Sequence, residues 1–320
     1  MSISMRNNKL LDNPAISEYK SHKFTKENGL YPYNNTTETV YGYTNENLRQ
    51  YINLLNLSGG RVATTGSSFD QVLYAVYQGA EEVTLLDGCP YAIPMGELKI
   101  SAIKNMSLSE FNDYWNSYNV FDKGYYNELL ADVSDNTVEF LAFVENRLKH
   151  AKRKYDVISN IIKPHSFPAR SNYYKNGCEF YDNDKNFAKL KTRLRYAHIN
   201  SELVEYHDFP KVLTGKYSSI MLSNIYDYIG TSKFFEVARD MITNNLANGG
   251  TMQLHYAFSS YNKTDVNLNN FTCLDKTYNR YGVQNVINMD KKKKSDDLAK
   301  KYTKYGANEF DETVYIYEKD

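Results

Sequence analysis

Short polar segments follow two β-prone runs of this sequence, and their residue types could bind a ligand. Thr65-Gly66-Ser67-Ser68-Phe69-Asp70-Gln71 follows the run 61–65. Gly66 permits a tight turn, while Ser67 and Ser68 offer hydroxyl and backbone N–H groups where a helix begins, which suits a carboxylate or a phosphate. Asp87 follows the run 82–86. An ionised carboxylate at that point can accept two hydrogen bonds from ribose hydroxyls.

The later strand ends predict the rest of a site. We expect Asp208 to accept the exocyclic amine of an adenine, with Phe209 against the ring, at the end of a strand at 202–206. Ser223 and Asn224 follow a buried run at 217–222, where a substrate would meet a cofactor. The candidate cofactor-binding residues are therefore Thr65, Gly66, Ser67, Ser68, Asp70, Gln71, Asp87, Asp208, Phe209, Ser223 and Asn224.

Candidate catalytic and substrate residues lie nearby. A base is expected among Tyr226, Asp227, Tyr228 and His255. Tyr41 and Tyr43, before the first predicted helix, are candidate substrate contacts. Each of these features has a structural alternative, because a Gly-Ser turn and an Asp before Gly are common in loops, and a strand-end His is often only hydrogen-bonded. Their order and spacing together favour the site.

The elements that must position these residues alternate between strand and helix. Residues 1–43 are predicted to form an N-terminal arm, and residues 44–320 one domain. A helix is expected from Thr44 to the Gly59-Gly60 stop, followed by a strand-helix-strand unit, an insertion of helices at about 106–182, and further strands. The last helix is expected at 232–247, with a stop at Asn248-Gly249-Gly250 and a strand at 251–258 after it. Runs at 283–289 and 313–317 predict a terminal hairpin. About seven strands with crossover helices indicate a doubly wound, Rossmann-like α/β sheet.

Composition excludes several classes of protein. Lys and Arg number 38 and so do Asp and Glu, so the chain lacks the net positive charge of a typical nucleic-acid binder. Three cysteines, Cys89, Cys178 and Cys273, form neither a disulfide framework nor a zinc motif, so we expect a cytoplasmic protein without metal. No apolar run is long enough for a transmembrane segment. The 30 tyrosines fit a biased composition better than a binding surface.

The glycine pattern limits the kinds of cofactor that this turn could bind. Only Gly66 is present where a dinucleotide fingerprint has three glycines, so close approach of the backbone to a pyrophosphate is disfavoured. A nucleoside cofactor without a pyrophosphate fits better. S-adenosylmethionine offers a ribose and an adenine for the acidic residues and an α-carboxylate for the serine turn.

One segment also carries a family resemblance. Residues 62–115 contain Gly66-Ser67-Ser68 with Asp70-Gln71, the strand-end Asp87, a helix with Glu97-Leu98-Lys99, and a Leu-Ser step from Leu108 to Phe111. This pattern resembles the S-adenosylmethionine-dependent 3-amino-3-carboxypropyl transferases that include the betaine-lipid enzymes acting on diacylglycerol. From about residue 196 onward, including Ser223 to Tyr228, the sequence resembles the wider class I methyltransferase fold.

The resemblance implies a transferase that binds S-adenosylmethionine and moves the aminocarboxypropyl or the methyl group to a small-molecule or lipid-like acceptor. Three alternatives remain open at this point: a methyltransferase, a binding module without turnover, and an oxidoreductase that uses NAD(P), which the missing glycines disfavour.

Overall fold

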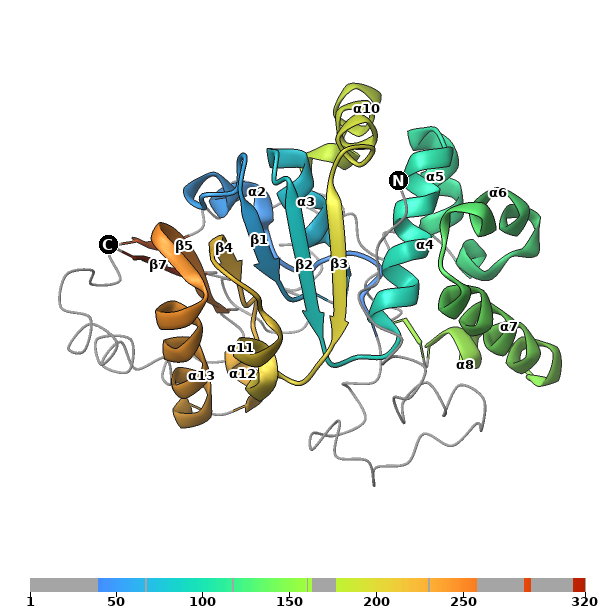
Figure 1. The fold of residues 1–320 in the computed structure, drawn as a ribbon. Coiled ribbons are helices and arrows are strands. Elements are labelled where there is room, and N and C mark those ends of the chain that lie inside the picture. Colours follow the sequence, from blue (N-terminus) through green and yellow to red (C-terminus); the bar gives the residue numbers. More distant parts are fainter. Residues whose placement is uncertain are drawn as a thin grey trace, which may run out of the picture.

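One sheet of seven strands runs through the described part of the chain, which is residues 40–66, 68–116, 118–159, 161–162, 177–229, 231–257, 285–288 and 313–319 of a computed structural model. The strand order is β3-β2-β1-β4-β5-β7-β6 (Figure 1). The strands are β1 (Arg61–Thr64), β2 (Glu82–Asp87), β3 (His198–Leu203), β4 (Tyr217–Met221), β5 (Leu246–Ala257), β6 (Asn285–Asn288) and β7 (Thr313–Glu318).

Strand direction identifies the fold. Strands β1 to β5 are joined by parallel pairings, whereas β7 is antiparallel to both of its neighbours, β5 and β6. A doubly wound sheet with this strand order, in which the antiparallel β7 lies between β5 and β6, is the class I methyltransferase fold. The predicted fold class and the antiparallel pairing of the last two strands are both confirmed.

Helices cover both faces of the sheet because side chains alternate along the strands. Val62 and Met221 pack in one core with α3 and α4, while Ala63 and Ile220 pack in a second core with α11 and α13. The helices are α2 (Leu48–Tyr51), α3 (Asp70–Gln78), α4 (Ala92–Asn105), α5 (Leu108–Trp115), α6 (Tyr126–Leu129), α7 (Asp135–His150), α8 (Lys154–Ser159), α10 (Asp184–Arg193), α11 (Phe209–Val212), α12 (Tyr226–Ile229) and α13 (Thr231–Asn244).

Helices α5 to α8 lie between β2 and β3 in the chain, within the range predicted for an insertion, and stand to one side of the sheet in Figure 1. Helix α5 begins with a capping box, since the Ser107 hydroxyl accepts from the Glu110 N–H while the Glu110 side chain accepts from the Ser107 N–H. Among the described residues, no helix has the length and apolar character needed to cross a membrane.

Three predicted boundaries are wrong. The helix expected from Thr44 is only the single turn of α2 followed by a 3-10 turn at Ile52–Leu54. Strand β3 ends at Leu203, three residues before the predicted end, because it is a polar edge strand without a continuous apolar run. Strand β5 begins at Leu246, where a helix end and a glycine loop were expected, since Gly249 and Gly250 pair with Lys319.

Candidate functional site

The candidate site lies where the strand order reverses. Strands β1 and β4 are neighbours, but β2 and β3 continue to one side of them while β5 continues to the other. The carboxyl ends of the parallel strands share the lower edge of the sheet in Figure 1, where the arrowheads of β2 and β3 point. Ligands of doubly wound sheets bind outside this edge, at this reversal.

Backbone strain marks both turns at the reversal. Phe69, after β1, has φ +67°, and Ser223, after β4, has φ +54°. A non-glycine residue in this region costs about 1–3 kcal/mol and persists only where the surroundings hold it. The Phe69 ring packs on Gly96 of α4, and the Gln253 side chain hydrogen-bonds both the N–H and the C=O of Ser223. The two turns are therefore held in fixed conformations.

Asp87 is the acidic group at the end of β2, as the sequence predicts. Its Oδ1 accepts the Cys89 N–H at 2.8 Å, and the Gly66 N–H also hydrogen-bonds the carboxylate. Burial raises the pKa of Asp87 from its ordinary 3.8 to about 6, although these two hydrogen bonds oppose the shift. The contact with Gly66 brings the end of β2 to the turn after β1.

Thr65 and Gly66 form the side of that turn nearest Asp87. Thr65 is buried, and its hydroxyl oxygen has no hydrogen-bond partner within the described structure. Gly66 has φ +148°, and a Cβ there would lie 2.4 Å from Gln71 Oε1, so only glycine fits. Gln71 and Ser68 are themselves buried and hydrogen-bonded to each other. An unpaired hydroxyl beside a partly exposed turn can receive a ligand's polar group.

A buried ion pair between Lys99 and Asp70 holds the turn after β1 in place. Lys99 Nζ of α4 lies 2.5 Å from Asp70 Oδ1, and both side chains are fully buried. Lys99 also donates to the carbonyls of Gly42 and Ser68, each at 2.9 Å, while Asp70 accepts from the Thr44 N–H and the Tyr181 hydroxyl. Asp70 was predicted to contact a cofactor. The structure instead commits its carboxylate to these internal partners.

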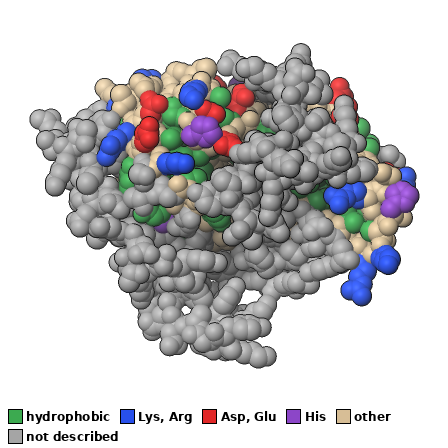
Figure 2. All heavy atoms as spheres, turned by 90° about the horizontal axis from the view of Figure 1, so that it is seen from below, with side chains coloured by type: hydrophobic (Ala, Val, Ile, Leu, Met, Phe, Trp, Pro, Cys, Tyr) green, Lys and Arg blue, Asp and Glu red, His purple; other side chains and the backbone are tan. Residues whose placement is uncertain are grey.

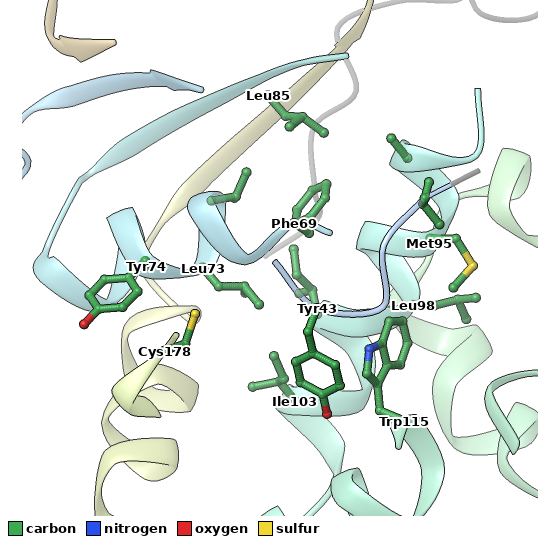
Figure 3. Close-up of a cluster of buried hydrophobic side chains, with 14 of the residues drawn as sticks. Tyr43, Phe69, Leu73, Tyr74, Leu85, Met95, Leu98, Ile103, Trp115 and Cys178 are labelled. Atoms are coloured by element: carbon green, nitrogen blue, oxygen red, sulfur yellow. The ribbon is translucent and has the colours of Figure 1, made fainter. Parts of the chain in front are cut away.

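Aromatic rings close around the same lysine. Lys99 Nζ lies 4.8 Å from the ring centre of Tyr43, 5.6 Å from that of Trp115 and 5.7 Å from that of Tyr181. Figure 3 shows Tyr43 beside Trp115 among core side chains. Burial lowers the pKa of Lys99, which Asp70 counteracts. Tyr43, predicted as a substrate contact, is fully buried and donates to Asn116 Oδ1, so that prediction is wrong.

A second acidic residue, which the sequence reasoning missed, lies beside Ser223. Glu46 is buried, accepts the Tyr51 hydroxyl at 2.6 Å and accepts a hydrogen bond from the Ser223 hydroxyl. The backbone N–H of the next residue, Asn47, donates to the Tyr256 hydroxyl of β5 at 2.9 Å. The segment 40–47 is therefore fastened to the turn after β1 through Thr44 and to the turn after β4 through Glu46.

The predicted adenine contacts lie elsewhere than expected. Because β3 ends at Leu203, Asp208 falls in a 3-10 turn at Tyr206–Asp208. Its carboxylate faces Lys211 at 2.6 Å and His207 at 3.1 Å, and the hydrogen bond from Lys211 lowers the pKa of Asp208. Phe209 is buried against Tyr206 in the core beneath α13, so its predicted contact with a ligand ring is wrong.

The predicted bases differ in their surroundings. Tyr226 is buried edge-on against Phe234 and lies 4.8 Å from the ring of His255. Burial lowers the pKa of His255 to about 3, so it is neutral and a weak base at physiological pH. Tyr228 is 38% exposed and Tyr41 is partly exposed, so both stay candidates. Ser67 and the side chain of Asp227 lie outside the described residues.

In the part of the chain that the structure describes, no group of three or more His, Cys, Asp or Glu side chains is arranged to hold a metal ion. Cys89 and Cys178 are buried free thiols. Cys273 lies outside the described residues.

The raised pKa of Asp87 predicts how stability depends on pH. A carboxyl whose pKa is higher in the folded chain destabilises the fold when ionised, so its cost is absent below about pH 4 and complete above about pH 7. We expect Asp87→Asn to raise the free energy of unfolding at pH 7.5 by about 1–3 kcal/mol relative to wild type, and to change it much less at pH 4. Urea unfolding at both pH values measures this, and an equal difference at both would contradict it.

Comparisons with known proteins add little to this geometry. No protein-family model matches the sequence, and no curated protein matches it. Among solved structures, YjhP from E. coli is similar over 89% of this chain and 97% of its own, with 11% identity and a TM-score of 0.38. The rRNA methyltransferase AviRa from Streptomyces viridochromogenes is similar over 92% of this chain and 94% of its own, with 10% identity and a TM-score of 0.38. The fold assignment therefore depends on the strand order.

Proposed function

We propose that this chain binds S-adenosylmethionine at the carboxyl edge of β1, β2 and β4 and is a transferase. The observation that carries the proposal is the position of Asp87. It is a half-buried carboxylate at the end of β2 that hydrogen-bonds the glycine turn after β1, next to the reversal of strand order. Two ribose hydroxyls can donate to such a carboxylate, and a ligand at this edge would meet it.

The neighbouring residues fit the rest of the cofactor. Thr65 offers a buried hydroxyl oxygen that has no partner among the described residues, and the neighbouring Gly66 is partly exposed, so a ligand carboxylate could approach this turn. Ser223 and Asn224 lie across the reversal, where an acceptor would approach. The cofactor would supply an electrophilic carbon attached to a positive sulfur. The chain's own residues would bind it, orient it and hold the acceptor in line.

The transferred group distinguishes two forms of the proposal. The family resemblance favours the 3-amino-3-carboxypropyl group, whereas the fold is equally suited to methyl transfer. Mass spectrometry of the products after incubation with S-adenosylmethionine and candidate small-molecule or lipid-like acceptors separates them. Methylthioadenosine indicates the first reaction and S-adenosylhomocysteine the second. Binding without either product would favour a catalytically silent module.

Removing the carboxylate at position 87 tests the cofactor site itself. We expect Asp87→Ala to weaken S-adenosylmethionine binding by about 1–3 kcal/mol, a five- to 150-fold rise in Kd, through loss of charge-assisted hydrogen bonds to the ribose. Isothermal titration calorimetry measures it. Asp182→Ala, which removes an exposed carboxylate paired with Arg49, is the control and should leave Kd unchanged. No binding by wild type, or equal binding by Asp87→Ala, would refute the site.

A further inference from the structure

A basic surface stands at the outer end of α7, away from the candidate site. Arg147, Lys149, Lys152, Arg153 and Lys154 lie within eight residues, together with His150, and all six are exposed; we call this set the basic tip. No acidic residue interrupts the stretch 147–154. Figure 2 shows Lys, Arg and His side chains gathered at the right edge of the molecule, where α7 ends.

Helix stabilisation explains only part of the basic tip. Arg147, Lys149 and His150 are in the last turn of α7, where cations interact favourably with the helix dipole. Lys152 and Arg153 lie between the helices, and Lys154 is the first residue of α8, where a cation opposes the dipole. Glu145 neutralises one cation, through an ion pair of 2.9 Å with Lys149. The remaining positive charge needs another explanation.

The distribution of charge over the chain favours a flat anionic partner. The sequence has 38 cationic and 38 acidic side chains, so the five cations of the tip leave 33 against 38 elsewhere. A long nucleic acid would meet this net negative remainder, whereas a planar surface can touch the tip alone. Clusters of four to eight Lys and Arg on an amphipathic helix are typical of binding to anionic lipids. Arg147 and Lys149 lie on α7, whose Phe140, Leu141 and Val144 are buried, and the other three cations of the tip follow directly in the chain.

We propose that the basic tip docks the protein on an anionic lipid bilayer. The contact would be electrostatic and peripheral, with the lysine and arginine side chains against lipid phosphate and carboxylate groups. In Figure 2 the tip projects at the periphery of the molecule, where a flat surface can reach it. This inference does not require that the chain bind S-adenosylmethionine.

Vesicle co-sedimentation tests the proposal with the full chain and no added cofactor. We expect wild type to bind vesicles of phosphatidylcholine mixed with phosphatidylserine, to bind vesicles of phosphatidylcholine alone far less, and to be released by high salt. Replacing Arg147, Lys149, Lys152, Arg153 and Lys154 with Gln should lower the partition coefficient at least tenfold, since each basic side chain near the surface contributes roughly fivefold.

A charge-matched control separates this site from general basicity. A variant with Gln at five other exposed cations of α10, its following turn, the residue before β4 and α13 should change binding by less than twofold; these are Lys185, Lys189, Arg195, Lys216 and Lys233. Equal binding to both kinds of vesicle, or equal loss in the control, would overturn the proposal. The proposal would also be overturned if the protein bound no vesicles but bound RNA, and if the five Gln substitutions abolished the RNA binding. Fluorescence anisotropy measures the RNA binding. Circular dichroism checks folding, and Lys152→Gln with Lys154→Gln is the milder variant.

Discussion

Lys99→Met is expected to lower the free energy of unfolding by about 3–5 kcal/mol, the cost of leaving one partner of a buried ion pair without the other. Lys99 and Asp70 are both fully buried, and the lysine also donates to the carbonyls of Gly42 and Ser68. Methionine keeps much of the volume but supplies none of these hydrogen bonds. Urea denaturation followed by circular dichroism measures the loss.

A double-mutant cycle separates the pair from simple repacking. Asp70→Asn removes the opposite charge, so the double variant should lose clearly less stability than the two single losses added together. Lys149→Met is the matched control, because its ion pair with Glu145 lies on the surface and should contribute about 0.5 kcal/mol or less. Additive losses, or a Lys99→Met effect as small as the control, would show that the pair does not stabilise the turn.

Gly96→Ala is expected to destabilise the fold by about 1–3 kcal/mol, although alanine in a helix interior normally stabilises relative to glycine. A Cβ at position 96 would lie 2.0 Å from Cδ2 of the Phe69 ring. Phe69 cannot move away freely, because its φ of +67° sets the turn after β1 and its N–H donates to the Gly66 carbonyl. Thermal and urea unfolding measure the effect.

The same variant connects stability to the candidate site. If Phe69 holds the glycine turn, Gly96→Ala should also weaken S-adenosylmethionine binding, and Phe69→Leu in the same chain should restore part of the stability. Gly124→Ala is the control, because a Cβ there would meet only Asp122 Oδ1, at 3.5 Å, and should change stability by no more than about 0.5 kcal/mol. A stabilising Gly96→Ala would refute the packing argument.

The fold could be predicted because its signals are local. Runs such as 82–87 are short, apolar and followed by helices, so the parallel core of the sheet follows from periodicity and from the rule that crossovers are right-handed. Strand β3 was misplaced because an edge strand has one neighbour and tolerates polar residues. The boundary error then placed Asp208 and Phe209 at a strand end that does not exist there.

The supports of the candidate site were harder to predict because they join distant positions. Asp87 and Gly66 follow directly from the strand ends. Lys99 and Asp70 are 29 residues apart, and Glu46 and Ser223 are 177 apart, so periodicity carries no information about either pair. One signal was present: Lys99 lies in a stretch of α4 whose other residues are mostly apolar. A charged residue surrounded in this way indicates a buried partner.

The placement of β7 has a consequence for the order in which the sheet can be assembled during synthesis. In the chain β6 precedes β7, yet β6 joins the rest of the sheet through β7, which lies between it and β5. Until residues 313–318 have left the ribosome, β5 keeps an open edge and β6 has no strand of this sheet beside it. Open strand edges recruit other chains, so this interval is when a nascent molecule is most exposed to aggregation and to chaperones.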